Sequence, residues 1–157
     1  MVTPAQLRSI PWFSQLPEEQ LAALAAIGTE RSLPAGAVVH SEDNVADTVY
    51  VILEGRVGVR ISLRPFIKSR QLCLDVLQTG ELFGWSALVP PHKLTGSAVC
   101  LMDVRLIAWE REPLRAALEK DPVLGYRFMS LLSEVVATRL RDARMQLIQE
   151  LAQTSQD

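Results

Sequence analysis

One short segment of the chain combines a glycine, an aromatic ring and hydroxyl side chains, groups that can hold a small anion or a ring compound. Gly84 permits close approach of a ligand to the backbone, and a short helix beginning after it could turn free N–H groups toward an anion. Hydroxyl groups and a second glycine follow about ten residues later. The candidate binding residues are Phe83, Gly84, Trp85, Ser86, Ala87, Thr95, Gly96 and Ser97.

The same residues have an ordinary structural interpretation. Gly84 would make a turn, the Trp85 indole would pack into the pocket, and the hydroxyls would cap backbone groups. An indole also offers a face on which a purine can stack. The sequence leaves open whether Trp85 stacks on a ligand or blocks the pocket.

The residue pattern gives little support for metal binding, redox chemistry or hydrolysis. Cys73 and Cys100 lie in apolar runs, so we expect both in the core. His40 and His92 have no carboxylate or cysteine at metal-ligand spacing, and Ser86 lacks the second glycine of a nucleophile elbow. We therefore expect no catalytic residue, no metal and no enzymatic activity.

The composition is that of one folded, nearly neutral domain. The 157 residues are 48% hydrophobic, and 16 Lys and Arg stand against 18 Asp and Glu. This balance favours a packed core and argues against general attraction to nucleic acids or anionic membranes. No apolar run approaches the roughly 20 residues of a membrane span, and the first residues lack a signal peptide's apolar stretch, so we expect a cytoplasmic protein.

The hydrophobic period changes twice along the chain and predicts its organisation. Residues 1–28 should form a helical lead-in that ends at Gly28, and residues 29–110 read as short strands separated by turns. Residues 111–151 should form a short helix and then a long one with Asp121 as its N-cap, followed by a tail over 152–157. The predicted fold is therefore α+β, with an antiparallel jelly-roll-like β-roll, short N-terminal helices and a long C-terminal helix, all in one domain.

The long helix carries an apolar stripe that points to a partner. At about 45 Å it is longer than a domain of this size can cover, so we expect a homodimer through this helix. Arg139 and Gln146 interrupt a strict heptad seam and leave an imperfect pairing open. The stripe consists of Met129, Leu132, Val136, Leu140, Ala143 and Leu147.

Four motifs, in register over about residues 10 to 150, resemble the cyclic nucleotide-binding domain of Crp/Fnr-type regulators and of protein kinase A regulatory subunits. Residues 31–39 resemble the family's first turn, and residues 44–57 resemble its central hairpin. Residues 80–88 fall at its phosphate-binding cassette, and residues 95–98 fall where that cassette closes, which places the cassette at 80–98.

The resemblance implies a regulatory module that binds cAMP, cGMP or another nucleotide and signals through its long helix. In family members that bind these ligands, a Glu after Phe-Gly holds the ribose and an Arg about ten residues later pairs with the cyclic phosphate. Here the first position is Trp85, and the second falls among the uncharged residues 94–96. Arg139 or Arg144 on the long helix could supply the cation from another direction, or could simply keep the helix soluble.

Two functions thus stay open at this stage. One is a non-enzymatic nucleotide sensor with a degenerate cassette, and the other is a ligand-free interaction domain that dimerises through the C-terminal helix or binds another protein. Transcriptional members of the family continue into a DNA-binding domain after this helix, whereas the present sequence ends at Asp157. We therefore expect no direct DNA binding.

Overall fold

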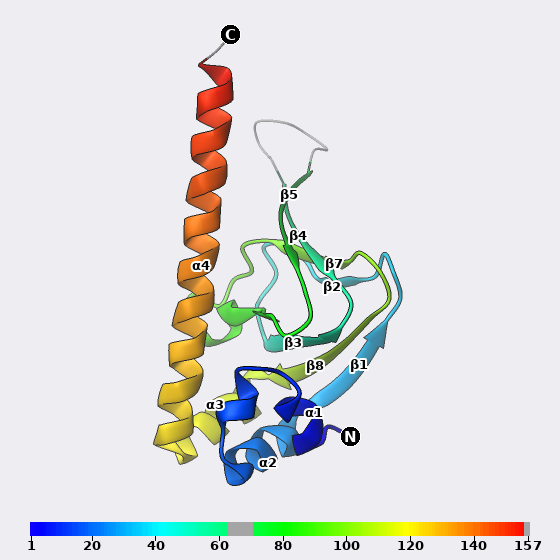
Figure 1. The fold of residues 1–157 in the computed structure, drawn as a ribbon, viewed down its shortest axis with the longest axis vertical. Helices are drawn as coiled ribbons and strands as arrows, with labels where there is room; N and C mark the ends of the chain where they lie inside the picture. The colour runs from blue at the N-terminus through cyan, green and yellow to red at the C-terminus, as the bar shows by residue number, and fades with distance from the viewer. Residues whose placement is uncertain (63–70, 156–157) are drawn as a thin grey trace.

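The computed structural model describes residues 1–62 and 71–155, which form two β-sheets flanked by helices (Figure 1). The helices are α1 (Pro4–Arg8), η1 (Phe13–Gln15), α2 (Glu18–Ile27), η2 (Trp85–Leu88), α3 (Arg111–Lys120) and α4 (Pro122–Thr154). The strands are β1 (Thr29–Leu33), β2 (Val38–His40), β3 (Thr48–Glu54), β4 (Val57–Ser62), β5 (Gln71–Leu77), β6 (Leu82–Phe83), β7 (Ser97–Cys100) and β8 (Val104–Glu110).

Within the described residues the strands make two four-stranded antiparallel sheets. Their orders are β1-β8-β3-β6 and β2-β7-β4-β5, so strands distant in sequence become neighbours. The short N-terminal helices lie at one end of the sheets, and α4 runs along one side (Figure 1). The predicted α+β class, with a β-roll and a long C-terminal helix, is confirmed.

β3 and β8 are buried on both faces because they separate two hydrophobic cores. Alternate side chains of a strand point to opposite faces, so each strand contributes to both cores. The core inside the roll takes Tyr50, Ile52, Leu106 and Ala108. The core between the sheet and the helices takes Val49, Val51, Ile107 and Trp109. These strands therefore read as continuous apolar runs rather than as alternating ones.

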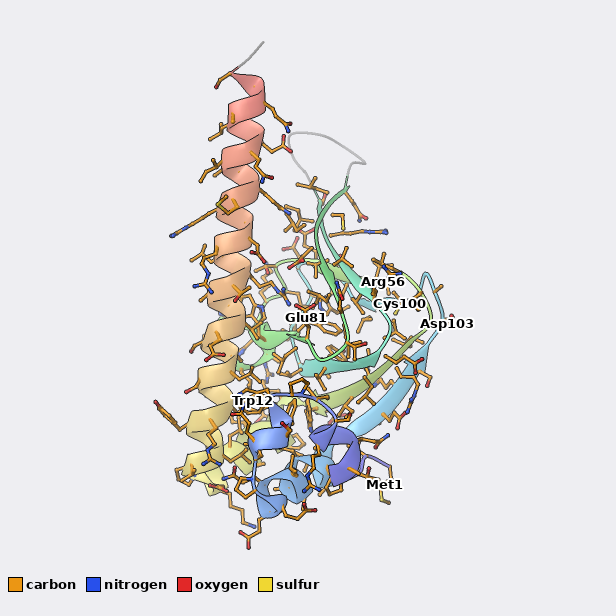
Figure 2. The ribbon with its side chains drawn as sticks, in the orientation of Figure 1. Met1, Trp12, Arg56, Glu81, Cys100 and Asp103 are labelled. Atoms are coloured by element: carbon orange, nitrogen blue, oxygen red, sulfur yellow. The ribbon has the colours of Figure 1, made fainter. Side chains whose placement is uncertain are left out.

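Aromatic rings dock the N-terminal lead-in and the start of α4 on the second core. The Trp109 indole Nε1 donates a hydrogen bond to the carbonyl oxygen of Leu24 at 2.9 Å. The ring of Phe128 meets those of Trp109 and Trp12 edge to face, at centroid distances of 6.4 and 6.0 Å. Figure 2 shows Trp12 close to α4. The first turns of α4 are thus fixed by the core, while its later turns run past the strands (Figure 1).

The N-terminus of α4 follows the expected capping chemistry. The Asp121 carboxylate accepts hydrogen bonds from the backbone N–H groups of Val123 and Leu124, both at 3.1 Å, and Pro122 occupies the first turn. The helix has 33 residues and ends at Thr154, three residues beyond the expected end. Part of the predicted tail is therefore helical, since nothing in residues 152–154 breaks a helix.

The prediction that both cysteines lie in the core is wrong for one of them. Cys100 is buried inside the roll, whereas Cys73 is exposed on β5. β5 is the last strand in its sheet, and residues 71–73 are exposed on both faces. An apolar run on an edge strand therefore does not guarantee burial. Among the described residues, no helix has the length and apolar character needed to cross a membrane.

Candidate functional site

The cassette begins with a turn that only glycine accommodates. Gly84 follows β6 and has φ of +75°, in the left-handed region. A Cβ at this position would lie 2.6 Å from the carbonyl oxygen of Thr48 on β3. The chain can turn so close to β3 only without a side chain, and it then enters the short helix η2 at Trp85.

The second half of the cassette is held by the segment that precedes β3. The backbone N–H of Ala46 donates to the carbonyl of His92 at 2.8 Å, and that of Leu94 donates to the carbonyl of Asn44 at 3.0 Å. These bonds fix residues 92–94 before the chain enters β7. The cassette is therefore held against β3 at its Phe83–Gly84 end and against the segment that precedes β3 at its other end.

A cavity of about 350 Å³ lies between the cassette and α4. The cassette wall contains six of the eight predicted site residues: Phe83, Gly84, Trp85, Ser86, Thr95 and Gly96. The helix wall contains Val136, Arg139, Leu140, Asp142, Ala143 and Gln146. The roll supplies His40, Val59, Leu74, Asp75 and Leu77, and Leu94 is a further residue of the cassette wall. Trp85 thus lines the cavity and leaves it open.

Two predicted cassette residues do not line this cavity. Ala87 is buried in the core between the sheet and the helices, on the other side of η2. The Ser97 hydroxyl accepts a hydrogen bond from the backbone N–H of Glu42 at 2.9 Å, so it caps a backbone group. The capping interpretation therefore holds for Ser97.

The two candidate cations on the long helix differ in placement. Arg139 lines the cavity, but its Nη1 lies 2.8 Å from the Asp75 carboxylate and 3.6 Å from that of Glu81. Figure 2 shows Glu81 on the side of the roll that faces α4. Arg144 is exposed and is absent from the described cavity lining. The only guanidinium at the described wall is thus already paired with carboxylates of the roll.

A second polar contact joins α4 to the same strand. The Gln146 Nε2 donates to the Leu74 carbonyl oxygen at 2.7 Å. Arg139 and Gln146, which interrupt the apolar stripe, are therefore the residues that attach α4 to β5. In the sequence, the only signal for these contacts was that two polar residues interrupt the apolar stripe. Nothing in the sequence identified Asp75 and Leu74 as their partners.

His40 contributes a neutral ring to the floor of the cavity. Burial lowers the pKa of His40 to about 4, against partial opposition from the backbone groups of Gly96 and of His40 itself. The His40 Nδ1 atom is buried and has no hydrogen-bond partner among the described residues, so neither backbone group forms a hydrogen bond with it. The ring lies 6.0 Å from Phe83 and 6.3 Å from Tyr50, centroid to centroid.

The structure divides the predicted dimer stripe into two sets. Leu132 is buried in the chain's own core, and the half-buried Val136 lines the cavity. Met129, Leu140, Ala143 and Leu147 are exposed, and Leu140 and Ala143 also line the cavity. Only the exposed set is free to meet a partner. The part of the stripe that lies beside the roll packs within the same chain, because the roll covers that side of the helix.

Comparisons with known proteins agree on one family. The model of the cyclic nucleotide-binding domain matches residues 30–121, more than half of the chain. The cyclic AMP receptor protein of Thermus thermophilus is 26% identical over 141 residues, which cover 90% of this chain and 62% of the receptor. The cGMP-dependent protein kinase, isozyme 1, of Drosophila melanogaster is 30% identical over 95 residues, covering 60% of this chain and 12% of the kinase.

Solved structures give the same result. A structure from Geobacter metallireducens, assigned to the cyclic nucleotide-binding proteins, has a TM-score of 0.74 and 32% identity, covering 89% of this chain and 99% of that one. The Thermus thermophilus catabolite activator protein has a TM-score of 0.70 and 26% identity, covering 87% of this chain and 61% of that one. The chain thus spans less than two thirds of its curated bacterial relatives. With its roll, its cassette and its matched residues in the same order, the chain belongs to the cyclic nucleotide-binding domain family.

Proposed function

We propose that this chain is a non-enzymatic regulatory module in which a small molecule binds between the cassette and α4 and sets the position of the helix. The observation that carries the proposal is the cavity itself, whose wall is shared by the cassette, the roll and α4. A ligand in this place contacts a rigid part and a helix at once. It therefore favours whichever helix position gives it the better contacts.

The way in which α4 is attached to the roll is consistent with a helix whose later turns move when a ligand binds. Its first turns pack in the core through Leu124, Phe128 and Leu132. Beyond them, Arg139 and Gln146 make polar contacts between α4 and the roll. An occupant next to these contacts can strengthen or break them without unfolding the core. The movement would then be passed to whatever the far end of α4 contacts.

cAMP and cGMP are the first ligands to test because the relatives' names refer to them. The test is thermal melting with cAMP, cGMP, cyclic dinucleotides, linear nucleotides, adenosine and inorganic phosphate. A ligand at 100 times its Kd adds about 2.7 kcal/mol of stability, which raises Tm by several degrees in a domain of this size. A rise with one of these ligands supports the proposal.

A pair of variants assigns the site. Ala143→Phe places a large ring at the rim of the cavity and should obstruct it, whereas Ala152→Phe makes the same change at an exposed position of α4 outside the cavity lining. We expect the ligand-induced rise in Tm to disappear in the first variant and to persist in the second. A rise that persists in Ala143→Phe places binding elsewhere and contradicts the proposal.

A second candidate function is dimerisation through α4, favoured by apolar side chains that the chain leaves open. Leu147, Ile148 and Leu151 are each more than half exposed, near the C-terminal end of the helix. Burying them against an identical helix would give a two-fold dimer. Sedimentation equilibrium tests this candidate. Leu147→Glu should shift the protein toward monomer, and Gln149→Glu, with the same new charge on the same turn, should not.

A further inference from the structure

The charges at the cavity do not favour an anion. Its described lining holds the carboxylates of Asp75 and Asp142 and a single guanidinium, that of Arg139. Arg139 is committed to Asp75 at 2.8 Å, and Glu81 lies 3.6 Å from the same nitrogen. The wall is therefore neutral to acidic in sum. A phosphate placed here would bring another negative charge to this group of carboxylates.

Releasing Arg139 to bind a phosphate has a further cost. Asp75 and Arg139 have only about a quarter of their side-chain surface exposed. Removing the guanidinium would leave the Asp75 carboxylate partly buried and unpaired. The hydroxyls of Ser86 and Thr95, on the cassette wall, offer neutral hydrogen bonds instead.

The rest of the wall is apolar and partly aromatic. Phe83 and Trp85 supply rings, and aliphatic side chains come from the roll and from α4, Leu77 and Val136 among them. A volume of about 350 Å³ is within the range of small-molecule sites and accommodates a compound of two or three rings. Apolar surface, neutral donors and a paired cation together define one chemical class of occupant.

We propose that the cavity between the cassette and α4 selects an uncharged, largely apolar ring compound and excludes anions of the same shape. This inference rests on the proposed function and names the class of its ligand. The ion pair between Arg139 and Asp75 is the element that excludes the anion, because it removes the only guanidinium of the described wall from use. Ser86 and Thr95 orient the occupant through neutral hydrogen bonds.

The test uses two fluorescent probes that differ by one negative charge. N-phenyl-1-naphthylamine is uncharged, and 1-anilinonaphthalene-8-sulfonate is the same molecule with a sulfonate. Fluorescence titration of the full chain should show binding of the uncharged probe at least about tenfold tighter, the effect of roughly one charge-assisted interaction. Ala143→Phe should abolish this binding, Ala152→Phe should retain it, and cAMP should not displace the probe.

A gain-of-function variant tests the role of the ion pair. Asp75→Asn removes the nearer of the two carboxylates at Arg139 and leaves Glu81 at 3.6 Å. Binding of the sulfonated probe should therefore tighten by about tenfold or more, while binding of the uncharged probe changes little. Asp142→Asn makes the same change in cavity charge but leaves the ion pair intact. It should give a clearly smaller gain. Equal gains in the two variants would overturn the role assigned to the ion pair.

The remaining outcomes separate this inference from the proposed function. If the sulfonated probe or cAMP binds the cavity as tightly as the uncharged probe, the inferred ligand class is wrong, but a ligand-binding module remains. If neither probe binds in a way that Ala143→Phe blocks, the inferred class is also wrong. The melting experiment with the nucleotide panel then decides the proposed function by itself.

Discussion

Gly84 controls the cassette turn through two separate constraints, its positive φ and its distance from β3. Gly36 has a similar φ of +85°, but a Cβ there would meet nothing within 4 Å. Gly36→Ala should therefore cost about 1 kcal/mol for the backbone conformation alone. Gly84→Ala should cost about 1 to 3 kcal/mol more, because its Cβ would overlap the Thr48 carbonyl oxygen.

Urea denaturation of the two glycine variants measures this difference. Gly36→Ala is the matched control, since it carries the same strain in φ without the overlap. Equal losses of unfolding free energy in the two variants would contradict a close approach of the cassette to β3.

His40 should make stability depend on pH in the acidic range. Its pKa is about 4 in the folded protein and 6.5 by reference, so between these values the unfolded chain binds a proton that the folded chain does not. The free energy of unfolding therefore falls as the pH falls from 6.5 toward 4, by up to about 3 kcal/mol from this group. His40→Phe, which keeps a ring beside Tyr50 and Phe83, should remove that contribution.

The measurement is urea denaturation of both proteins between pH 8 and pH 4. Protonation of carboxylates also destabilises the fold in acid, so the quantity of interest is the difference in unfolding free energy between the two proteins. That difference should be constant above pH 7 and should change in favour of His40→Phe below pH 6.5. A difference independent of pH would mean that His40 is protonated in the fold as easily as in the unfolded chain.

Among the elements, α4 and β5 are held together by contacts that can be weakened without disturbing the core. Arg139→Ala should lower the free energy of unfolding by about 1 kcal/mol, since the pair with Asp75 is partly exposed to water. It should also speed hydrogen exchange in the α4 turns around residues 139–146. Exchange around Phe128 should change little, because this part of α4 is fixed in the core.

Two controls accompany this variant. Arg141→Ala removes an exposed arginine of α4 that donates a hydrogen bond to the Thr138 hydroxyl within the same helix. A double-mutant cycle with Asp75→Asn should show that the losses are not additive. Additive losses would contradict the ion pair as the link between the two elements.

The elements themselves were predictable because their signals are local. The acidic first turn of α2, the Asp121 cap and the hydrophobic period of a strand or helix each depend on residues that lie only a few positions apart. The order of the cassette motifs likewise located six residues of the cavity wall. A local pattern reports a local structure, and these features required no knowledge of distant contacts.

The contacts that give the site its charge were not predictable in the same way. Asp75 and Arg139 are 64 residues apart, and Leu74 and Gln146 are 72 apart. Their pairing depends on the rotation of α4 against β5, which no local pattern reports. The exposure of Cys73 has the same origin, since only the sheet order places β5 at an edge.

At the scale of the whole molecule, the C-terminal end of α4 has no packing partner among residues 1–62 and 71–155. Among the described residues, Gln146 is the last residue of α4 whose side chain forms a hydrogen bond with the roll, and the described residues beyond it are exposed on all faces. A helical stretch shorter than about 12 residues is marginal in water without packing partners. As the uncovered end of a longer helix, these turns should fray in water and should be protected where something covers their apolar side chains.

Hydrogen exchange of residues 147–154 at several protein concentrations tests what that cover is. If a second copy pairs with α4, these amides should exchange slowly at high concentration and faster on dilution, because dissociation exposes the helix end. In Leu147→Glu they should exchange fast at every concentration, whereas Gln149→Glu should behave like the original chain. Fast exchange of the original chain at all concentrations would contradict pairing through α4.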